Sequence, residues 1–409
     1  MHFLWKRTLY SAATTAALTA SAPAQQPVSR IEAVEAAVVR GPRLAVAQAD
    51  TAVALAQLLV ARAIPDPTLA ASYTKDPPQY HASLDLPIDF PWLRGVRVGS
   101  AEAARLAAQY RYAFARAAAA LDADTTYTRS LAARARAELS RRNARDADSL
   151  RRMAAVRRDA GDASDLDVEL ATVNAGQQAN VAAADSLTYV STLFDLQTVM
   201  GIRADNTVVI PVDSLTPPAD ADGDGAAPPT ATLEVAAAEQ ALSSATLALR
   251  LQQRSVWGAP SLTVGVDTHD PTADKQELLP LVGLAMPLPL FGRHRGQIAQ
   301  ARAELVRARA ELALAQVEGA ARIARARRER DIALTKVRRD RVLIASANRV
   351  AAMSLTAYRE GESSLPNVLE AQRNARDVLG QYIDDVAQAW IASASLRVFT
   401  LTVQSSAAR

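Results

Sequence analysis

The feature that most constrains this chain is an internal repeat. Residues 160–164 (AGDAS) recur 200 positions later as residues 360–364 (EGESS), and each copy separates two helical runs rich in Ala, Arg and Glu. Upstream, Leu86-Pro87 matches Met286-Pro287 at the same spacing. Self-similarity of this kind indicates a chain built twice from one unit. The order strand, strand, long helix, sharp turn, helix predicts an elongated wall of helices rather than a globular domain.

Composition supports long, thin helices. The chain has 409 residues and is 49% hydrophobic but only 5% aromatic. Alanine favours helices and allows them to approach closely, but it fills little core volume. The 46 basic and 43 acidic residues are interspersed, which is typical of solvated helix faces and not of a nucleic-acid surface. The absence of cysteine excludes disulfides, thiolate metal sites and a lipoprotein anchor.

The N-terminus has the pattern of a secretory signal peptide. Lys6 and Arg7 precede an apolar stretch, and Ala22-Pro23-Ala24 provides a small-residue cleavage site. We therefore expect residues 1–24 to be removed on export. Later in the sequence we recognise no apolar run of about 18 residues, so no membrane-spanning helix is expected.

The remaining chain divides into two repeats. Each is predicted to hold a helix, two strands and a long helical hairpin. A segment rich in Pro, Asp and Gly separates the repeats and reads as a linker. The expected boundaries are 25–210 for the first repeat, with its tip at 160–164; 211–230 for the linker; 231–403 for the second repeat, with its tip at 360–364; and 404–409 for a tail.

Four short segments alternate between polar and apolar residues: 68–75, 79–90, 261–268 and, less clearly, 279–288. One face carries His81, Asp85, Asp89 and Asp267. This pattern fits a membrane β-barrel with an apolar surface toward lipid and a polar lumen. Two hairpins this far apart cannot close a barrel alone, so several chains are needed to pair every strand edge. A half-buried hairpin in a soluble α+β protein would show the same alternation.

The repeated turns predict sharp hairpin tips. Gly161 and Gly361 stand where a helix ends in a left-handed residue. Ser164 and Ser364 can cap the following helices, with Asp167 completing a capping box in the first copy. Pro366 falls in the first turn of its helix, where proline is tolerated. Such tips are natural docking points for a partner, and the residues we assign to docking are Gly161, Asp162, Ser164, Gly361, Glu362 and Ser364.

The repeat, the Leu-Pro strand exits and the tip run 358–372 (YREGESSLPNVLEAQ) resemble the TolC-type outer membrane efflux protein family, the outer membrane factors. The exit at residues 288–296 is similar to that of the heavy-metal, CzcC-like branch. The resemblance implies a mostly α fold with a small membrane β part, in which a homotrimer forms a barrel and a periplasmic coiled-coil tunnel. It also implies a periplasmic adaptor protein and an inner-membrane RND or ABC transporter as partners.

Family entrances are narrowed by acidic residues just after the second tip. The matching positions here are Asn367 and Glu370, so only Glu370 keeps the acid. The resemblance therefore implies three carboxylates around the entrance of a trimer, and a weaker preference for cations than two acidic rings would give.

The function expected from the sequence is a passive outer membrane duct with a large periplasmic part, exporting small molecules or metal ions. No enzyme, cofactor or resident metal is expected, because His81, His269 and His294 lack metal-ligand spacing and no phosphate loop or nucleophile motif is present. The alternatives are a type I secretion duct for polypeptides, a soluble periplasmic coiled-coil scaffold or adaptor, and an exported enzyme.

Overall fold

The computed structural model describes residues 25–203, 208–218, 232–255, 260–269, 278–286 and 294–402. The expected signal peptide, most of the expected linker, the C-terminal tail and residues 287–293 of the second strand exit lie outside these ranges.

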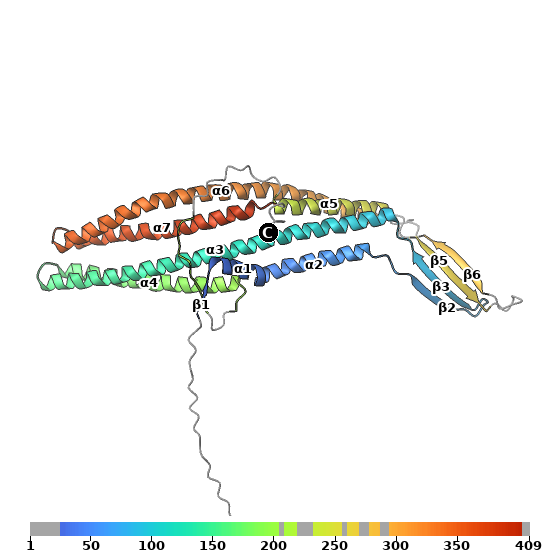
Figure 1. Ribbon diagram of the computed structural model, residues 1–409, viewed down its shortest axis with the longest axis horizontal. Coiled ribbons are helices and arrows are strands. Elements are labelled where there is room, and N and C mark those ends of the chain that lie inside the picture. Colours follow the sequence, from blue (N-terminus) through green and yellow to red (C-terminus); the bar gives the residue numbers. More distant parts are fainter. Residues whose placement is uncertain are drawn as a thin grey trace, which may run out of the picture.

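The molecule is a long, narrow array of helices with a small sheet at one end (Figure 1). The helix α3 (Pro91–Asp159) turns back into α4 (Asp165–Val199), and α6 (Arg295–Arg359) turns back into α7 (Leu365–Phe399). With 69 residues, α3 is roughly 104 Å long at 1.5 Å per residue. The two hairpins meet through α3 and α7. Nearer the sheet, α2 (Pro42–Arg62) packs on α3, and α5 (Leu233–Arg254) lies between α3 and α6.

Local sequence signals explain where the first helices begin and end. Ser29 caps α1 (Arg30–Arg40) in a capping box with Glu32. Gly41 ends α1, and Pro42 opens α2, so the first helical run is divided at this point. The long helices together are called the rods. Much of the core between them is alanine, including the nearly or fully buried Ala33, Ala37, Ala107, Ala123, Ala137, Ala154, Ala171 and Ala389.

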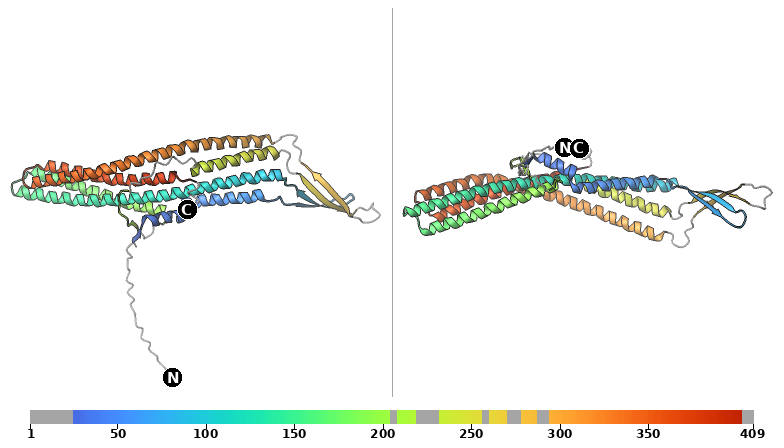
Figure 2. Two further views of the ribbon diagram at one scale, coloured as in Figure 1. Left: turned by 45° about the horizontal axis from the view of Figure 1, so that its top comes forward. Right: turned by 90° about the horizontal axis from the view of Figure 1, so that it is seen from below.

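Four antiparallel strands form one open sheet at the end of the rods (Figure 2). They are β2 (Thr68–Tyr73), β3 (Tyr80–Pro87), β5 (Ser261–Thr268) and β6 (Leu279–Ala285), in the order β2-β3-β5-β6. The pairing of β3 with β5 joins the two repeats, with Leu84 opposite Val264. Within the described residues, β2 and β6 each have one edge without a partner strand.

A second, two-stranded parallel sheet, which was not predicted from the sequence, lies midway along the long helices (Figure 1). It pairs β1 (Gln25–Val28) with β4 (Val208–Pro211). The buried hydroxyl of Tyr127 donates to the carbonyl of Val28 at 3.0 Å and to Asp213 at 2.8 Å. Burial and the bond to Asp213 raise the pKa of Tyr127 to about 12. These contacts fasten the N-terminal strand and the start of the linker to α3.

One helix departs from the expectation of no spanning segment. Within the described residues, Leu44–Arg62 of α2 is long and apolar enough to cross a membrane by length and composition. The expectation that no helix spans a membrane stays a prediction. Length and composition do not by themselves make a span, and α2 lies along α3 with Ala54, Leu58 and Ala61 buried.

Candidate functional site

The polar face of the sheet brings three of the expected lumen residues together. His81 and Asp267 are register partners on β3 and β5, and Nδ1 of His81 lies 2.8 Å from Oδ1 of Asp267. Asp85 accepts a hydrogen bond from the hydroxyl of its register partner Thr263. His81, Asp85 and Asp267 therefore share one face, and their exposure to a lumen remains a prediction.

Asp89 lies elsewhere and corrects the expected strand boundary. The strand β3 ends at Pro87, and Asp89 stands in the short segment before α3. Its carboxylate accepts from Arg97 of α3 at 2.8 Å. The alternating pattern continues through residue 90 in the sequence, but the pairing with β5 ends at Pro87 opposite Ser261, and α3 begins at Pro91. Asp89 joins the sheet end to the helices.

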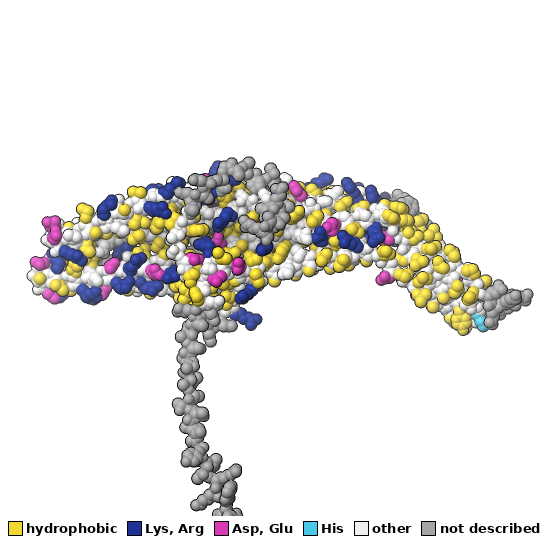
Figure 3. All heavy atoms as spheres, in the orientation of Figure 1, with side chains coloured by type: hydrophobic (Ala, Val, Ile, Leu, Met, Phe, Trp, Pro, Cys, Tyr) yellow, Lys and Arg dark blue, Asp and Glu magenta, His cyan; other side chains and the backbone are white. Residues whose placement is uncertain are grey.

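The opposite face of the sheet is apolar and open to the surroundings. One row of register partners crosses all four strands: Leu69, Leu84, Val264 and Val282. Their exposed fractions are 77%, 37%, 43% and 73%. Figure 3 shows hydrophobic side chains gathered over this end of the molecule. A contiguous exposed apolar face of this kind indicates contact with lipid or with another protein.

The two hairpin tips share one backbone geometry. Gly161 has φ 85° and Gly361 has φ 82°, as predicted for left-handed helix ends. In each tip the next amide donates back into the helix at 2.8 Å, from Asp162 to Arg157 and from Glu362 to Ala357. The six tip residues assigned to docking are all exposed: Gly161, Asp162, Ser164, Gly361, Glu362 and Ser364.

The helix caps differ between the tips. Ser164 caps α4, and the carboxylate of Asp167 accepts from the amide of Ser164 at 3.1 Å and from its hydroxyl at 3.0 Å. The expected cap by Ser364 was wrong, since its side chain makes no capping hydrogen bond. The carboxylate has no counterpart there, because the third position of α7 is Asn367. Pro366 does fall in the first turn of α7, as predicted.

An arginine ties the two tips to each other. Arg157, at the end of α3, donates to the carbonyl of Tyr358 and to that of Asp162. Its guanidinium also lies 4.7 Å from the centre of the Tyr358 ring. Burial raises the pKa of Tyr358. Beneath this contact lies a cluster drawn from all four hairpin helices: Leu150, Ala154, Ala171, Tyr358, Leu365 and Val368.

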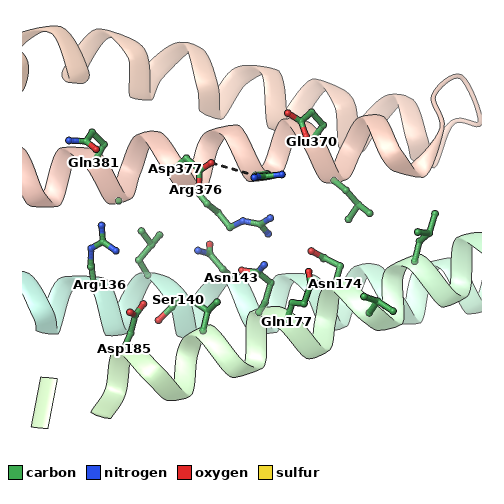
Figure 4. A pocket seen from close by; sticks show the side chains of 18 of the residues that line it. Arg136, Ser140, Asn143, Asn174, Gln177, Asp185, Glu370, Arg376, Asp377 and Gln381 are labelled. Atoms are coloured by element: carbon green, nitrogen blue, oxygen red, sulfur yellow. Dashed lines mark ion pairs between the residues drawn. The ribbon is translucent and has the colours of Figure 1, made fainter. Parts of the chain in front are cut away.

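The expected entrance residues lie on the first turns of α7. Asn367 and Glu370 are both exposed. Glu370 lines a cavity of about 910 Å³ bounded by α3, α4 and α7 (Figure 4). One chain does not form a ring, so narrowing of an entrance by these residues remains a prediction.

Sequence reasoning missed a buried acidic pair between α6 and α7. Asp340 and Asp385 are only 3% and 4% exposed, and Oδ2 of each has no hydrogen-bond partner. Nζ of Lys336 lies 3.3 Å from Oδ1 of Asp385. Burial, reinforced by the neighbouring carboxyl group of Asp385, raises the pKa of Asp340. An alternation or spacing rule would not find this pair, since it forms only when the helices meet. No group of three or more metal-ligating side chains occurs in the described part of the chain.

The sequence matches no protein-family model and no curated protein. Solved structures do match. A membrane protein from Pseudomonas aeruginosa superposes with a TM-score of 0.77 at 20% identity, over 91% of this chain and 93% of that one. The Campylobacter jejuni CmeC outer membrane channel gives 0.78 at 15% identity, over 91% and 85%. The Vibrio cholerae outer membrane protein VceC gives 0.75 at 15% identity, over 91% and 96%.

The chain has the same fold as the CmeC outer membrane channel and the outer membrane protein VceC. The expected fold class is thereby confirmed: mostly α, with a small sheet and long helical hairpins. Identity of 20% or less to these proteins shows a shared fold.

Proposed function

We propose that this protein is an outer membrane channel subunit that acts as a passive efflux duct. The observation that carries the proposal is the open sheet, whose one face is apolar and exposed while the other holds His81, Asp85 and Asp267. In lipid, an unpaired strand edge leaves backbone groups without hydrogen bonds. The free edges of β2 and β6 are therefore to be paired by sister chains in a closed barrel.

The duct is proposed to be a homotrimer with a large periplasmic part. The rods extend roughly 104 Å from the sheet, farther than any bilayer core is thick, so most of the helical length must lie outside the membrane. The work of the protein is then geometric and electrostatic, without catalysis or a cofactor. The export signal at residues 1–24 is part of this proposal.

The exposed tips are proposed to dock a periplasmic adaptor, which connects the duct to an inner-membrane RND or ABC transporter. The support is their position at the opposite end of the rods from the sheet (Figure 1) and their exposed, rigid turns. Small molecules or metal ions are the proposed cargo, with Glu370 providing acidic side chains near the entrance.

Cross-linking across the sheet edges tests the proposal. The chain has no cysteine, so a Ser72→Cys, Leu281→Cys variant carries only the two introduced thiols. Within one chain these positions lie on the two edge strands, β2 and β6. Three strand spacings separate those strands, and each spacing is about 4.8 Å. A short bifunctional maleimide is expected to join neighbouring chains and to give a trimer band from outer membrane fractions.

The single variants Ser72→Cys and Leu281→Cys are the matched controls and should give no trimer. A fully labelled double variant that stays monomeric and is recovered without detergent in the soluble fraction would overturn the duct and favour a soluble scaffold.

A further inference from the structure

Two polar contacts join the two hairpins, one near the tips and one nearer the sheet. Toward the tips the hairpins are held by Arg157 and Tyr358. Toward the sheet they are held by Arg136 of α3, whose guanidinium donates to both carboxylate oxygens of Asp384 of α7, at 3.0 and 2.6 Å. Between these two contacts the helices α3 and α7 are flanked by cavities.

The two cavities lie on either side of the α3–α7 contact. One, of about 910 Å³, is bounded by α3, α4 and α7. The other, of about 640 Å³, is bounded by α3, α6 and α7. Three residues line both: Leu139 and Asn143 of α3, and Arg376 of α7. The side chain of Arg376 therefore occupies the partition between the cavities.

Arg376 differs from the other arginines that line the larger cavity. Arg136 is paired with Asp384, and Nε of Arg373 lies 3.9 Å from Asp377. No carboxylate among the described residues lies within ion-pair distance of Arg376, although its side chain is half-buried and its burial lowers its pKa. A guanidinium withdrawn from water without an anionic partner is unfavourable, and a bound anion would remove that cost.

The surroundings of Arg376 add further donors and an apolar wall. The amide Nδ2 of Asn174 is buried without a hydrogen-bond partner. Figure 4 shows Arg376 directed from α7 toward the α3–α4 hairpin, with Asn143, Asn174 and Gln177 across the gap and Glu370 and Asp185 toward its two ends. The cavity is also lined by the apolar side chains of Leu139, Leu170, Val173, Val181 and Leu369.

We propose that the larger cavity between the hairpins binds an organic anion, whose carboxylate is held by Arg376 and whose apolar body lies against the leucines and valines. Ligand pockets in proteins have volumes of roughly 300–1,000 Å³, and this cavity falls in that range while far exceeding an inorganic ion. A planar guanidinium binds carboxylates through two parallel hydrogen bonds. The inference needs only the folded chain, so its failure would leave the proposed duct untouched.

Calorimetric titration of the full chain in non-ionic detergent tests the site. The probe is 2-naphthoate, and its uncharged analogue 2-naphthamide reports binding that does not depend on the carboxylate. Naphthoate is expected to bind the wild type and to lose about tenfold or more in affinity in Arg376→Gln, because a charge-assisted hydrogen bond is removed. Naphthamide should bind both proteins equally weakly.

Arg373→Gln is the matched control, since it removes an arginine from the same cavity that already lies near a carboxylate. It should leave naphthoate affinity within about twofold. Arg376→Lys keeps the charge without the planar fork and should fall between wild type and Arg376→Gln. Equal naphthoate affinity in wild type and Arg376→Gln, or no binding to the wild type, would overturn the site.

Discussion

The two hairpins have the same backbone geometry at their turns, but different side chains stabilise them. Both turns use a left-handed glycine and the same 2.8 Å return hydrogen bond. The first tip then uses a capping box, whereas the second has Pro366 and no side-chain cap. Deeper in the hairpins, Ser140 and Asp185 of the first repeat occupy the positions that Asp340 and Asp385 hold in the second, 200 residues later.

The difference shows which parts of the repeated unit are fixed by geometry. A chain that reverses between two helices needs a left-handed residue, and glycine accepts that conformation at little cost. Several different side chains can cap a helix or fill the contact between two helices. At these positions the two hairpins differ. Substitutions that compare matched positions can therefore measure how differently the two hairpins are stabilised.

The largest effect is expected from breaking the link between the tips. Arg157→Ala removes a charged hydrogen bond to Tyr358 and a ring contact, which should cost about 1.5–3 kcal/mol locally. Faster amide hydrogen exchange should appear at both tips. Arg158→Ala is the control, because that side chain pairs only with exposed acids of its own tip. Equal exchange in the two variants would mean that the tips are not coupled through Arg157.

The next effect concerns the shared glycines. Gly161→Ala and Gly361→Ala place a Cβ on a left-handed residue and should each cost about 1–2 kcal/mol. The costs should be similar, since neither site has backbone atoms close enough to clash with the new methyl. Hydrogen exchange of the last turns of α3 and α6 measures this. Gly176→Ala, within α4, is the control and should stabilise the chain slightly.

A smaller effect should separate the two caps. Ser164→Ala removes a capping hydrogen bond and is expected to destabilise the start of α4 by about 1 kcal/mol. Ser364→Ala removes no such bond and should change the start of α7 by much less. The measurement is exchange of the first-turn amides in each variant. Equal losses in the two hairpins would contradict the difference in capping.

The smallest effect concerns how the stability of the chain depends on pH through Asp340. The stability lost by the wild type increases as the pH rises. The pKa of Asp340 lies above its ordinary value of 3.8 because of burial and the neighbouring Asp385. The folded chain therefore binds this proton more tightly, and the stabilisation present below pH 3.8 is lost as pH rises through the folded pKa. Asp340→Asn cannot titrate, so its thermal stability should fall less than that of the wild type between acid and neutral pH.

Asp331→Asn, at an exposed position of the same helix, is the matched control for this titration. It should follow the wild-type pH dependence. A variant Asp340→Asn whose melting temperature follows the same pH profile as the wild type would show that Asp340 does not carry the extra proton.

Much of the architecture could be predicted because it rests on local signals. The strand Ser261–Thr268 lies where alternation placed it, and both glycine turns lie where the repeat placed them. The helix α3 begins at Pro91, since proline is accepted at a helix start, and the alternating pattern before it runs up to residue 90. Asp89 was misplaced for the same reason, because alternation gives no end point when a helix takes over.

The parts that could not be predicted depend on residues far apart in sequence. The parallel pairing of β1 with β4, the place of Arg376 between two cavities and the approach of Asp340 to Asp385 all arise when separate segments pack together. A single sequence does not state which segments will meet. The one visible difference between the two caps is that Asn367 stands where the first hairpin has Asp167, and residue type alone still predicted a cap by Ser364.

The pairing of β3 with β5 has a consequence for how the chain is made. His81 bonds to a residue 186 positions later, and Asp85 to one 178 positions later, whereas each helical hairpin is built from neighbours in sequence. Contacts of high sequence separation form slowly. During synthesis the first hairpin can fold before β5 emerges, so the sheet is completed late and its apolar face stays incomplete until the second half of the polypeptide has arrived.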